Sequence, residues 1–278
     1  MAANAAALRG ITKQYKDFTL GPVDMTVPAG SIVGLIGENG AGKTTLLKIL
    51  CGVNRADDGT VDLLGGSPAD AATRAKIGVV FEDAFFYGSF TAAQVARSLA
   101  GMYGAQWNAD SFSAYLRRFG LDAGKKLKEY SRGMRLKLSL AAALAHGPEL
   151  LVLDEATAGL DPVVRGELLD LFLEFIQDER HSIVMSSHIT ADLEQIADSI
   201  AYLHNGQLLF QENKDDLLQE YGVLHCGEDV LNSLPAGLVV FTRRGAYGCE
   251  SLVRERRTVQ ELLPEAVCDA ARLDDIMR

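Results

Sequence analysis

Short apolar runs alternate with amphipathic segments along roughly the first 200 residues of the chain. The apolar runs predict buried strands at residues 32–36, 77–81, 150–153 and 182–186. Helical spacing of apolar residues predicts helices at residues 43–50, 91–102, 110–119, 131–146, 163–176 and 189–197. Because strands and helices alternate, we expect an α/β fold whose layered core contains parallel strands. The helical block at about 83–145 separates two strands, so we expect it to form an inserted helical subdomain.

The pattern changes after about residue 220. Before this point, Asn205-Gly206 between two apolar runs predicts a hairpin. In the later part, a second hairpin is predicted at residues 238–241 and 250–253, and a short helix at residues 258–266. We therefore expect a main domain at residues 1–220 and a small C-terminal α+β appendage at residues 221–278.

The composition of the chain restricts its binding partners and its cellular compartment. A net charge of −10 disfavours nucleic acid as a partner, because an acidic surface repels phosphates. No apolar run reaches the roughly 20 residues that a membrane-spanning helix needs, and the first residues lack the pattern of a secretion signal. The four cysteines show no CxxC spacing, which predicts free thiols in a reducing environment. We therefore expect a folded cytoplasmic protein.

The segment GENGAGKTT at residues 37–45 fits the phosphate-loop pattern G-x-x-x-x-G-K-[ST] between a predicted strand and a predicted helix. Its glycines let backbone N–H groups face a phosphate chain at the positive end of that helix. Contacts with a nucleotide such as ATP are expected from Gly37, Glu38, Asn39, Gly40, Ala41, Gly42, Lys43, Thr44 and Thr45. Among these, Lys43 is expected to neutralise the β- and γ-phosphates, and the Thr44 hydroxyl to bind Mg²⁺.

Further candidate residues follow later strands or begin a helix. Asp154 and Glu155 end the run LLVLDE, where we expect Asp154 to hold Mg²⁺ and Glu155 to polarise the attacking water. His188 ends another run and can hydrogen-bond a γ-phosphate at the carboxyl edge of the sheet. Ser131 and Gly133 begin a predicted helix and can also contact an anion. Within one subunit they would duplicate the phosphate loop, which suggests a nucleotide held by a partner subunit.

The order of these motifs resembles the nucleotide-binding subunit of ATP-binding-cassette transporters, over roughly residues 8–220. The resemblance implies a P-loop NTPase cassette in which Glu155 is the catalytic base and His188 the switch residue. It implies that Tyr15 stacks on adenine and that Asp161, in the segment AGLD, communicates between two sites.

The same resemblance implies an assembly. Ser131 and Gly133 would contact the γ-phosphate of ATP bound to the opposite subunit, in a head-to-tail homodimer or heterodimer. Opening after hydrolysis would move a separate transmembrane permease, which places the chain at the cytoplasmic, inner face of the cell membrane.

The chain departs from the family pattern at three places. The usual LSGGQ signature reads YSRGM here, with Arg132 and Met134 at two of its positions. Glu82, or Asp83 in a shifted register, stands where a metal-binding Gln is usual, and Ala156 replaces a Pro. The oxygens of Glu82 can still reach the metal. A Ser-Arg/Lys-Gly-Met signature resembles a bacterial exporter subfamily whose members handle peptide-like or drug-like molecules, and the tail with YGVLHC and LDDIM resembles that subfamily too.

Two alternative functions stay open at this point. One is a soluble, non-transport ATPase of the same superfamily, although such proteins carry two cassettes or a long inserted coiled coil, and this sequence shows neither. The other is a regulatory subunit that binds ATP with little turnover, against which the intact Glu155 argues. We expect an active ATPase that powers export.

Overall fold

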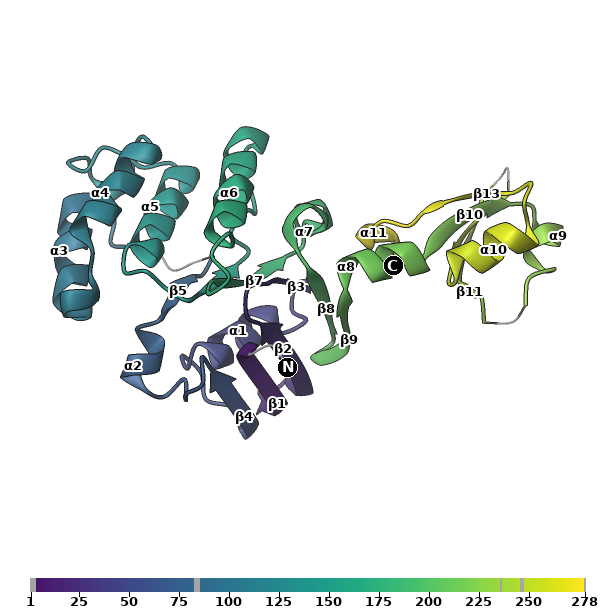
Figure 1. Ribbon diagram of the computed structural model, residues 1–278, viewed down its shortest axis with the longest axis horizontal. Helices are drawn as coiled ribbons and strands as arrows, with labels where there is room; N and C mark the ends of the chain where they lie inside the picture. Colours follow the sequence, from purple (N-terminus) through teal and green to yellow (C-terminus); the bar gives the residue numbers. More distant parts are fainter. Residues whose placement is uncertain (1–3, 83–85, 236, 246–247, 278) are drawn as a thin grey trace. The chain divides into compact units, whose positions relative to one another are not determined.

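The computed structural model of the protein describes residues 4–82, 86–235, 237–245 and 248–277 (Figure 1). The chain forms two compact units. The first contains Met1–Ile189 and Ile200–Gln211, and the second contains Thr190–Ser199 and Glu212–Arg278. Asp83, the alternative to Glu82 in the sequence analysis, lies outside the described residues.

A mixed sheet runs through the first unit. In spatial order its strands are β5 (Ile77–Val80), β6 (Leu150–Asp154), β7 (Ser182–Ser187), β3 (Ile32–Ile36), β8 (Ser199–His204) and β9 (Gln207–Asn213). The pairs β5–β6, β6–β7 and β7–β3 are parallel, so their carboxyl ends meet at one edge of the sheet. The predicted α/β fold with parallel strands is confirmed.

A second, antiparallel sheet has the strand order β2 (Thr19–Pro28), β1 (Asn4–Gln14) and β4 (Asp58–Leu63). The sequence analysis did not identify β1, because its first half is rich in Ala, which is depleted in strands. Its alanines are buried all the same, since β1 is the central strand and pairs with a neighbour on each side. Tertiary pairing therefore overrides the local preference.

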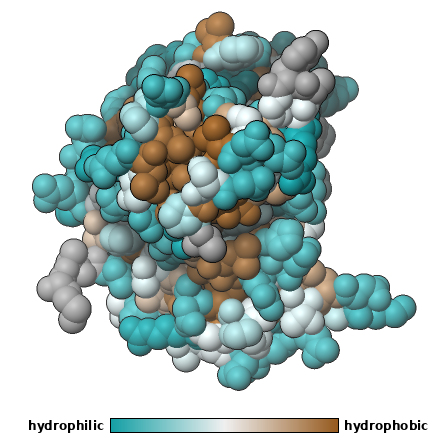
Figure 2. All heavy atoms as spheres, turned by 90° about the vertical axis from the view of Figure 1, so that its right-hand side faces the viewer, coloured by the Kyte–Doolittle hydropathy of each residue, from teal (hydrophilic) through white to brown (hydrophobic). Residues whose placement is uncertain are grey.

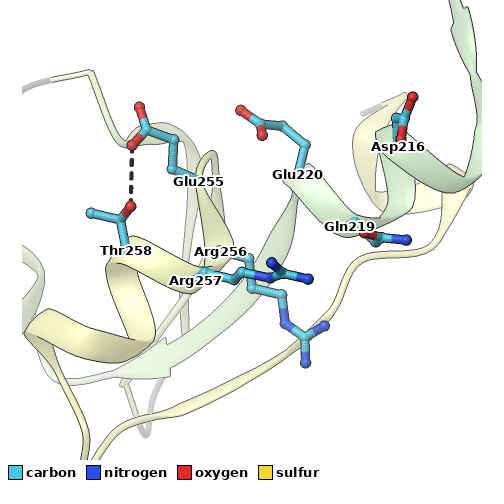
Figure 3. Close-up of a pocket in the computed structure, with 7 residues that line it drawn as sticks. All are labelled: Asp216, Gln219, Glu220, Glu255, Arg256, Arg257 and Thr258. Carbon is cyan, nitrogen blue, oxygen red and sulfur yellow. Dashed lines mark hydrogen bonds between the residues drawn. The ribbon is translucent and has the colours of Figure 1, made fainter.

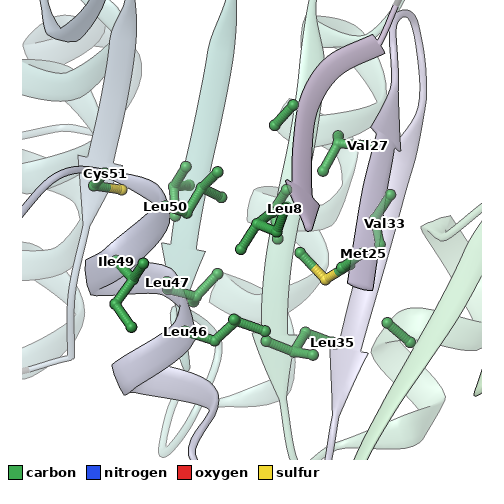
Figure 4. Packing of buried hydrophobic residues seen from close by; sticks show 14 of the residues in the cluster. Leu8, Met25, Val27, Val33, Leu35, Leu46, Leu47, Ile49, Leu50 and Cys51 are labelled. Atoms are coloured by element: carbon green, nitrogen blue, oxygen red, sulfur yellow. The ribbon is translucent and has the colours of Figure 1, made fainter. Parts of the chain in front are cut away.

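Helix α1 (Lys43–Leu50) anchors the segment that precedes it. Figure 4 shows Leu46 and Leu47 of this helix packed among apolar side chains of both sheets, including Leu8 and Leu35. All four of these leucines are at most 1% exposed. Burial of each such side chain contributes about 1.5–3 kcal/mol, which fixes the start of α1 relative to the sheet edge.

The inserted helical subdomain contains α3 (Ala92–Tyr103), α4 (Ala109–Arg118) and α5 (Arg132–Leu144), after the short α2 (Ala71–Arg74). Thr91 and Gln94 form the capping box that begins α3, which agrees with the start of the helix predicted at residues 91–102. Helix α5 ends before Gly147, which has a φ of +71°, and Pro148, so it is shorter than the predicted 131–146. Helix α6 (Pro162–Phe175) follows β6.

The second unit joins α7 (Thr190–Ile196) to the C-terminal residues. Its other helices are α8 (Lys214–Glu220), α9 (Glu228–Leu231), α10 (Arg256–Leu262) and α11 (Leu273–Ile276). Its antiparallel sheet has the order β11 (Val239–Gly245), β12 (Gly248–Val253), β10 (Gly222–Cys226) and β13 (Val267–Ala270). The boundary drawn from the sequence at residue 220 thus falls at the end of α8, inside this unit.

Two sequence predictions for this unit have different outcomes. The predicted hairpin is confirmed by the pairing of β11 with β12. The predicted helix at 258–266 is wrong at both ends, since α10 starts at Arg256 and ends at Leu262. Leu263 leaves helical geometry because the next residue is Pro264, which disfavours the α conformation before it.

The surface of the second unit carries both charged and apolar side chains. Figure 3 shows Asp216, Gln219 and Glu220 of α8 around the same pocket as Arg256 and Arg257 of α10. Figure 2 shows apolar side chains gathered on the face that it presents. The exposed apolar residues of this unit include Val230, Val240, Phe241, Leu262 and Val267.

Candidate functional site

The phosphate loop connects β3 to α1 at the carboxyl edge of the parallel strands. A Cβ atom on Gly37 would lie 2.2 Å from the carbonyl oxygen of Leu203, so only glycine fits there. Gly42 has a φ of +108°, and a Cβ on it would lie 2.8 Å from Cζ of Phe18. Lys43 Nζ donates to the carbonyl oxygens of Gly37, at 2.7 Å, and of Glu38, at 3.3 Å. The lysine ammonium therefore lies inside the curve of the loop.

A cavity of about 220 Å³ opens beside this loop. Its lining residues are Phe18, Glu38, Asn39, Gly40, Gly42, Lys43, Thr44, Thr45, Glu82 and Glu155. The structure thus brings most of the predicted phosphate loop together with Glu82 and Glu155, two acids that are far away in the sequence. Phe18 was missed by the sequence analysis, since only the pairing of β1 with β2 places it next to Gly42.

The oxygen atoms of Thr44, in the phosphate loop, and Asp154 meet in a hydrogen bond. Thr44 Oγ1 donates to Asp154 Oδ2 at 2.8 Å, and Ser186 Oγ donates to Asp154 Oδ1 at 2.7 Å. Asp154 is only 2% exposed, so these two hydroxyls are the hydrogen-bond partners of a buried carboxyl group. Mg²⁺ prefers hard oxygen donors of this kind, and the pair fits such an ion. Ser186 is a second residue that the sequence analysis missed.

Glu155 is fixed between two basic groups. Its Oε1 lies 3.3 Å from Lys43 Nζ, and its Oε2 lies 2.6 Å from His188 Nδ1. Its backbone has a φ of +52°, a conformation that costs about 1–3 kcal/mol in a residue with a side chain. Ser186 stabilises this turn, because its hydroxyl accepts the Glu155 N–H at 3.0 Å. Strain of this kind is concentrated at functional sites.

Tyr15 lies in the antiparallel-sheet region and is 42% exposed. Its hydroxyl accepts a hydrogen bond from Asn54 Nδ2 at 3.3 Å, and its ring centroid is 6.5 Å from that of Phe18. Through Phe18 the exposed ring of Tyr15 lies near the phosphate loop, although Tyr15 is not among the described residues that line the cavity.

Ser131 and Gly133 of the signature segment lie at the start of α5. Ser131 caps α5 by accepting the Met134 N–H at 3.2 Å, and Asp161 caps α6 by accepting the Val164 N–H at 3.0 Å. A Cβ on Gly133 would lie 3.6 Å from Cδ2 of Leu160, so the starts of these two helices are neighbours. The described lining of the phosphate-loop cavity includes neither Ser131, Gly133 nor Asp161.

Burial keeps the thiol of Cys51, the residue after α1, protonated. Cys51 directly follows α1 and is 2% exposed. Burial, and secondarily the negative charge of Asp154, raises the pKa of this thiol to about 12. It is therefore neutral at physiological pH.

The chain matches the ABC transporter family over residues 20–158. It belongs to the ATP-binding proteins of this family. Over 206 residues it is 38% identical to an uncharacterized ABC transporter ATP-binding protein of Synechocystis, covering 72% of this chain and 58% of that relative. Over 212 residues it is 36% identical to the bacitracin transport ATP-binding protein BcrA of Enterococcus faecalis, covering 74% of this chain and 68% of BcrA.

Two further comparisons agree. The lantibiotic transport ATP-binding protein SrtF of Streptococcus pyogenes is 33% identical over 211 residues, 75% of this chain and 90% of SrtF. A solved ATP-binding subunit of an ABC transporter is 28% identical, with a TM-score of 0.68 over 77% of this chain and 91% of that structure. The predicted family, the P-loop fold and the assignment as an ABC ATPase are thereby confirmed.

Proposed function

We propose that this protein is the ATP-hydrolysing subunit that powers export of a peptide-like or drug-like molecule through a separate membrane permease, with the phosphate-loop cavity as its ATP site. The observation that carries the proposal is the Glu155 carboxylate, held between Lys43 and His188 beside the phosphate loop. This arrangement suits turnover rather than storage of ATP, and so argues against a purely regulatory subunit. The relatives named for bacitracin and lantibiotic transport support a peptide-like substrate.

Each residue of the site has a distinct role in this proposal. The backbone N–H groups of the loop and the Lys43 ammonium bind the β- and γ-phosphates, exchanging the carbonyl contacts of Lys43 for phosphate oxygens. Thr44, Asp154 and Glu82 would hold Mg²⁺, with Ser186 orienting Asp154. When bound, Mg²⁺ neutralises charge on the phosphate oxygens during transfer.

Glu155 acts on the attacking water. Its carboxylate accepts a proton of the water as the water oxygen attacks the γ-phosphorus, and the bond from phosphorus to the leaving oxygen of the β-phosphate breaks in line. His188 Nδ1, at 2.6 Å, holds this carboxylate in its orientation. His188 is 52% exposed, so its ring also remains accessible to a γ-phosphate at the sheet edge.

The other predicted contacts need a second subunit and the nucleotide base. Ser131, Gly133 and Asp161 lie at neighbouring helix starts outside their own cavity, which supports a head-to-tail dimer in which they meet the partner's ATP. Tyr15 offers an exposed ring for adenine, next to Phe18. The dimer contains either two copies of this chain or this chain and a related one.

A largely apolar cavity of about 350 Å³ supports a permease contact. It lies between the parallel sheet and the helical subdomain, and its apolar lining includes Val53, Ile77, Val79, Phe81, Phe86 and Leu99. Phe81 directly precedes Glu82, whose loop faces the permease in this family. Among the described residues, every helix is too short or too polar to cross a bilayer. We place the subunit at the cytoplasmic face of the membrane, with no role for nucleic acid.

The test combines the chain with its permease. The two proteins are co-purified from membranes, reconstituted in inverted vesicles, and assayed for ATP hydrolysis and uptake of a peptide antibiotic. Lys43→Ala is expected to abolish both activities, whereas Lys137→Ala, which removes a comparably covered lysine paired with Glu167, leaves both intact. ATP-dependent uptake that persists in Lys43→Ala, or hydrolysis without any permease association, would overturn the proposal.

A further inference from the structure

Arg132, the residue after the signature serine, bridges two segments that lie far from it in the sequence. Its Nη2 donates to Glu82 Oε1 at 3.0 Å. Its guanidinium also lies over Gly159, where a Cβ would be 3.2 Å from Nη1 and 3.4 Å from Cζ. Gly159 has a φ of +68° and leaves room for the guanidinium. One side chain therefore joins the loop after β5, the start of α5 and the loop before α6.

Glu82 faces two sites at once. It is paired with Arg132, and it also lines the cavity that contains Lys43, Thr44 and Glu155. Both members of the pair are about half exposed, 44% for Glu82 and 47% for Arg132, so neither is locked in place by burial. An exposed ion pair is worth only about 0.2–1 kcal/mol, which a better partner in the cavity can exceed. The Glu82 carboxylate can therefore leave Arg132 for a partner in the cavity.

We propose that Arg132 is a positioning residue that competes with Mg²⁺–ATP for the carboxylate of Glu82. This inference rests on the function proposed above. With the ATP site filled, Glu82 turns to the metal and Arg132 is released. The released guanidinium lies next to Ser131, in the segment expected to meet the second subunit's triphosphate, where its positive charge favours closure.

Binding of Mg²⁺–ATP in the cavity and the Glu82–Arg132 ion pair must affect each other reciprocally. If filling the cavity frees Arg132, then removal of Arg132 must make Glu82 more available to the cavity by the same factor. Arg132→Ala is therefore expected to tighten the apparent affinity for Mg²⁺ in the presence of ATP, by about two- to five-fold. Glu82→Gln removes a negative charge from the metal and is expected to weaken that affinity. In the Glu82→Gln background, Arg132→Ala should have no further effect.

The experiment is a double-mutant cycle on Mg²⁺-dependent nucleotide binding, measured by calorimetry or by fluorescence of an ATP analogue rather than by turnover. The wild-type chain, Arg132→Ala, Glu82→Gln and the double variant are titrated with Mg²⁺ at fixed nucleotide concentration. Arg118→Ala is the matched control, because Arg118 pairs with Glu174 at 2.6 Å on the surface and neither residue is among the described residues that line the cavity. It should leave the titration unchanged. Arg132→Lys keeps the charge and should stay near the wild-type curve.

The outcomes separate this inference from the proposed function. If the wild-type chain itself shows no Mg²⁺-dependent ATP binding, the proposed function fails and this inference fails with it. If the wild-type chain binds and Arg132→Ala weakens Mg²⁺ affinity, or has equal effects in the wild-type and Glu82→Gln backgrounds, only the competition is overturned. Tightening that disappears in the Glu82→Gln background supports it.

Discussion

His188 Nδ1 and Glu155 Oε2 are 2.6 Å apart, and the other oxygen of the same carboxylate lies 3.3 Å from Lys43 Nζ. Both basic groups thus meet an acid that is only 9% exposed. A buried carboxylate without partners is costly, and these two contacts supply the partners of Glu155 beside the phosphate loop. A variant that removes only the charge of Glu155 keeps the side chain in place beside the phosphate loop. Such a variant can therefore test hydrolysis separately from ATP binding.

Glu155→Gln is expected to retain ATP binding and to lose hydrolysis. The amide keeps the size of the side chain but cannot accept the proton of the water. Unhydrolysed ATP should then hold two subunits together, and size-exclusion chromatography with ATP and Mg²⁺ should show a dimer. A chain that stays monomeric at saturating ATP and Mg²⁺ would argue against the shared site.

Ser186→Ala is expected to weaken both the fold and the metal site. The hydroxyl donates to Asp154 at 2.7 Å and accepts the Glu155 N–H at 3.0 Å, so its removal leaves two buried groups less satisfied. A hydrogen bond to a charged group is worth about 1.5–3 kcal/mol, and the free energy of unfolding in urea should fall by that order. Ser187→Ala is the neighbouring control, because the Ser187 hydroxyl contacts only Ile189 among the described residues. Equal losses in the two variants, with Mg²⁺ binding unchanged, would contradict the assignment.

Tyr15→Ala is expected to weaken ATP binding by about 1–3 kcal/mol, the contribution of one aromatic ring stacked on a base. Tyr15→Phe should bind nearly as well as the wild-type chain, because the ring remains and only the Asn54 contact is lost. Tyr87→Ala removes another exposed ring and serves as the control. The measurement is equilibrium binding of ATP and of inorganic triphosphate to each variant. Tyr15→Ala should weaken the binding of ATP and leave the binding of inorganic triphosphate unchanged. If Phe18→Ala shows the base-specific loss and Tyr15→Ala does not, Phe18 is the stacking residue.

His146 predicts a pH effect on stability. It packs on Tyr103 with ring centroids 4.4 Å apart, and its Nε2 lies 3.1 Å from the carbonyl oxygen of Ile77. Burial lowers the pKa of His146 below its ordinary value of about 6.5, so below pH 6.5 the unfolded chain binds the proton more readily than the folded chain. The stability that this residue contributes is complete above that pH and is lost as pH falls.

The measurement compares the free energy of unfolding of the wild-type chain and His146→Phe between pH 8 and pH 5. The Phe ring retains the stack on Tyr103 but does not titrate. The wild-type chain should lose stability more steeply on acidification. Parallel curves would show that His146 does not carry the effect.

Local motifs made much of the site predictable from the sequence. The phosphate loop and the acids after β6 are contiguous segments whose function depends on the strand and turn in which they lie. Glu82 was predicted as a metal ligand, but Phe18, Ser186 and the pairing of Glu82 with Arg132 were not predicted, because each depends on which segments are neighbours in the fold. The same reason explains β1, whose alanines favour a strand only when two partner strands cover them.

The chain passes from the first unit to the second and back before it ends in the second. This path limits where the chain can be truncated. Residues 190–199 belong to the second unit, although residues 200–211 return to the first. Within the second unit, Leu273 N–H and Glu194 Oε1 are 2.7 Å apart, and the Thr190 hydroxyl lies 2.7 Å from Asp274. A protein that ends near residue 220 would keep α7 but lose α11, and with it the hydrogen bonds of Thr190 and Glu194 to that segment. A single cut near residue 220 therefore does not separate the C-terminal unit from the rest of the chain, because α7 lies on the other side of that cut.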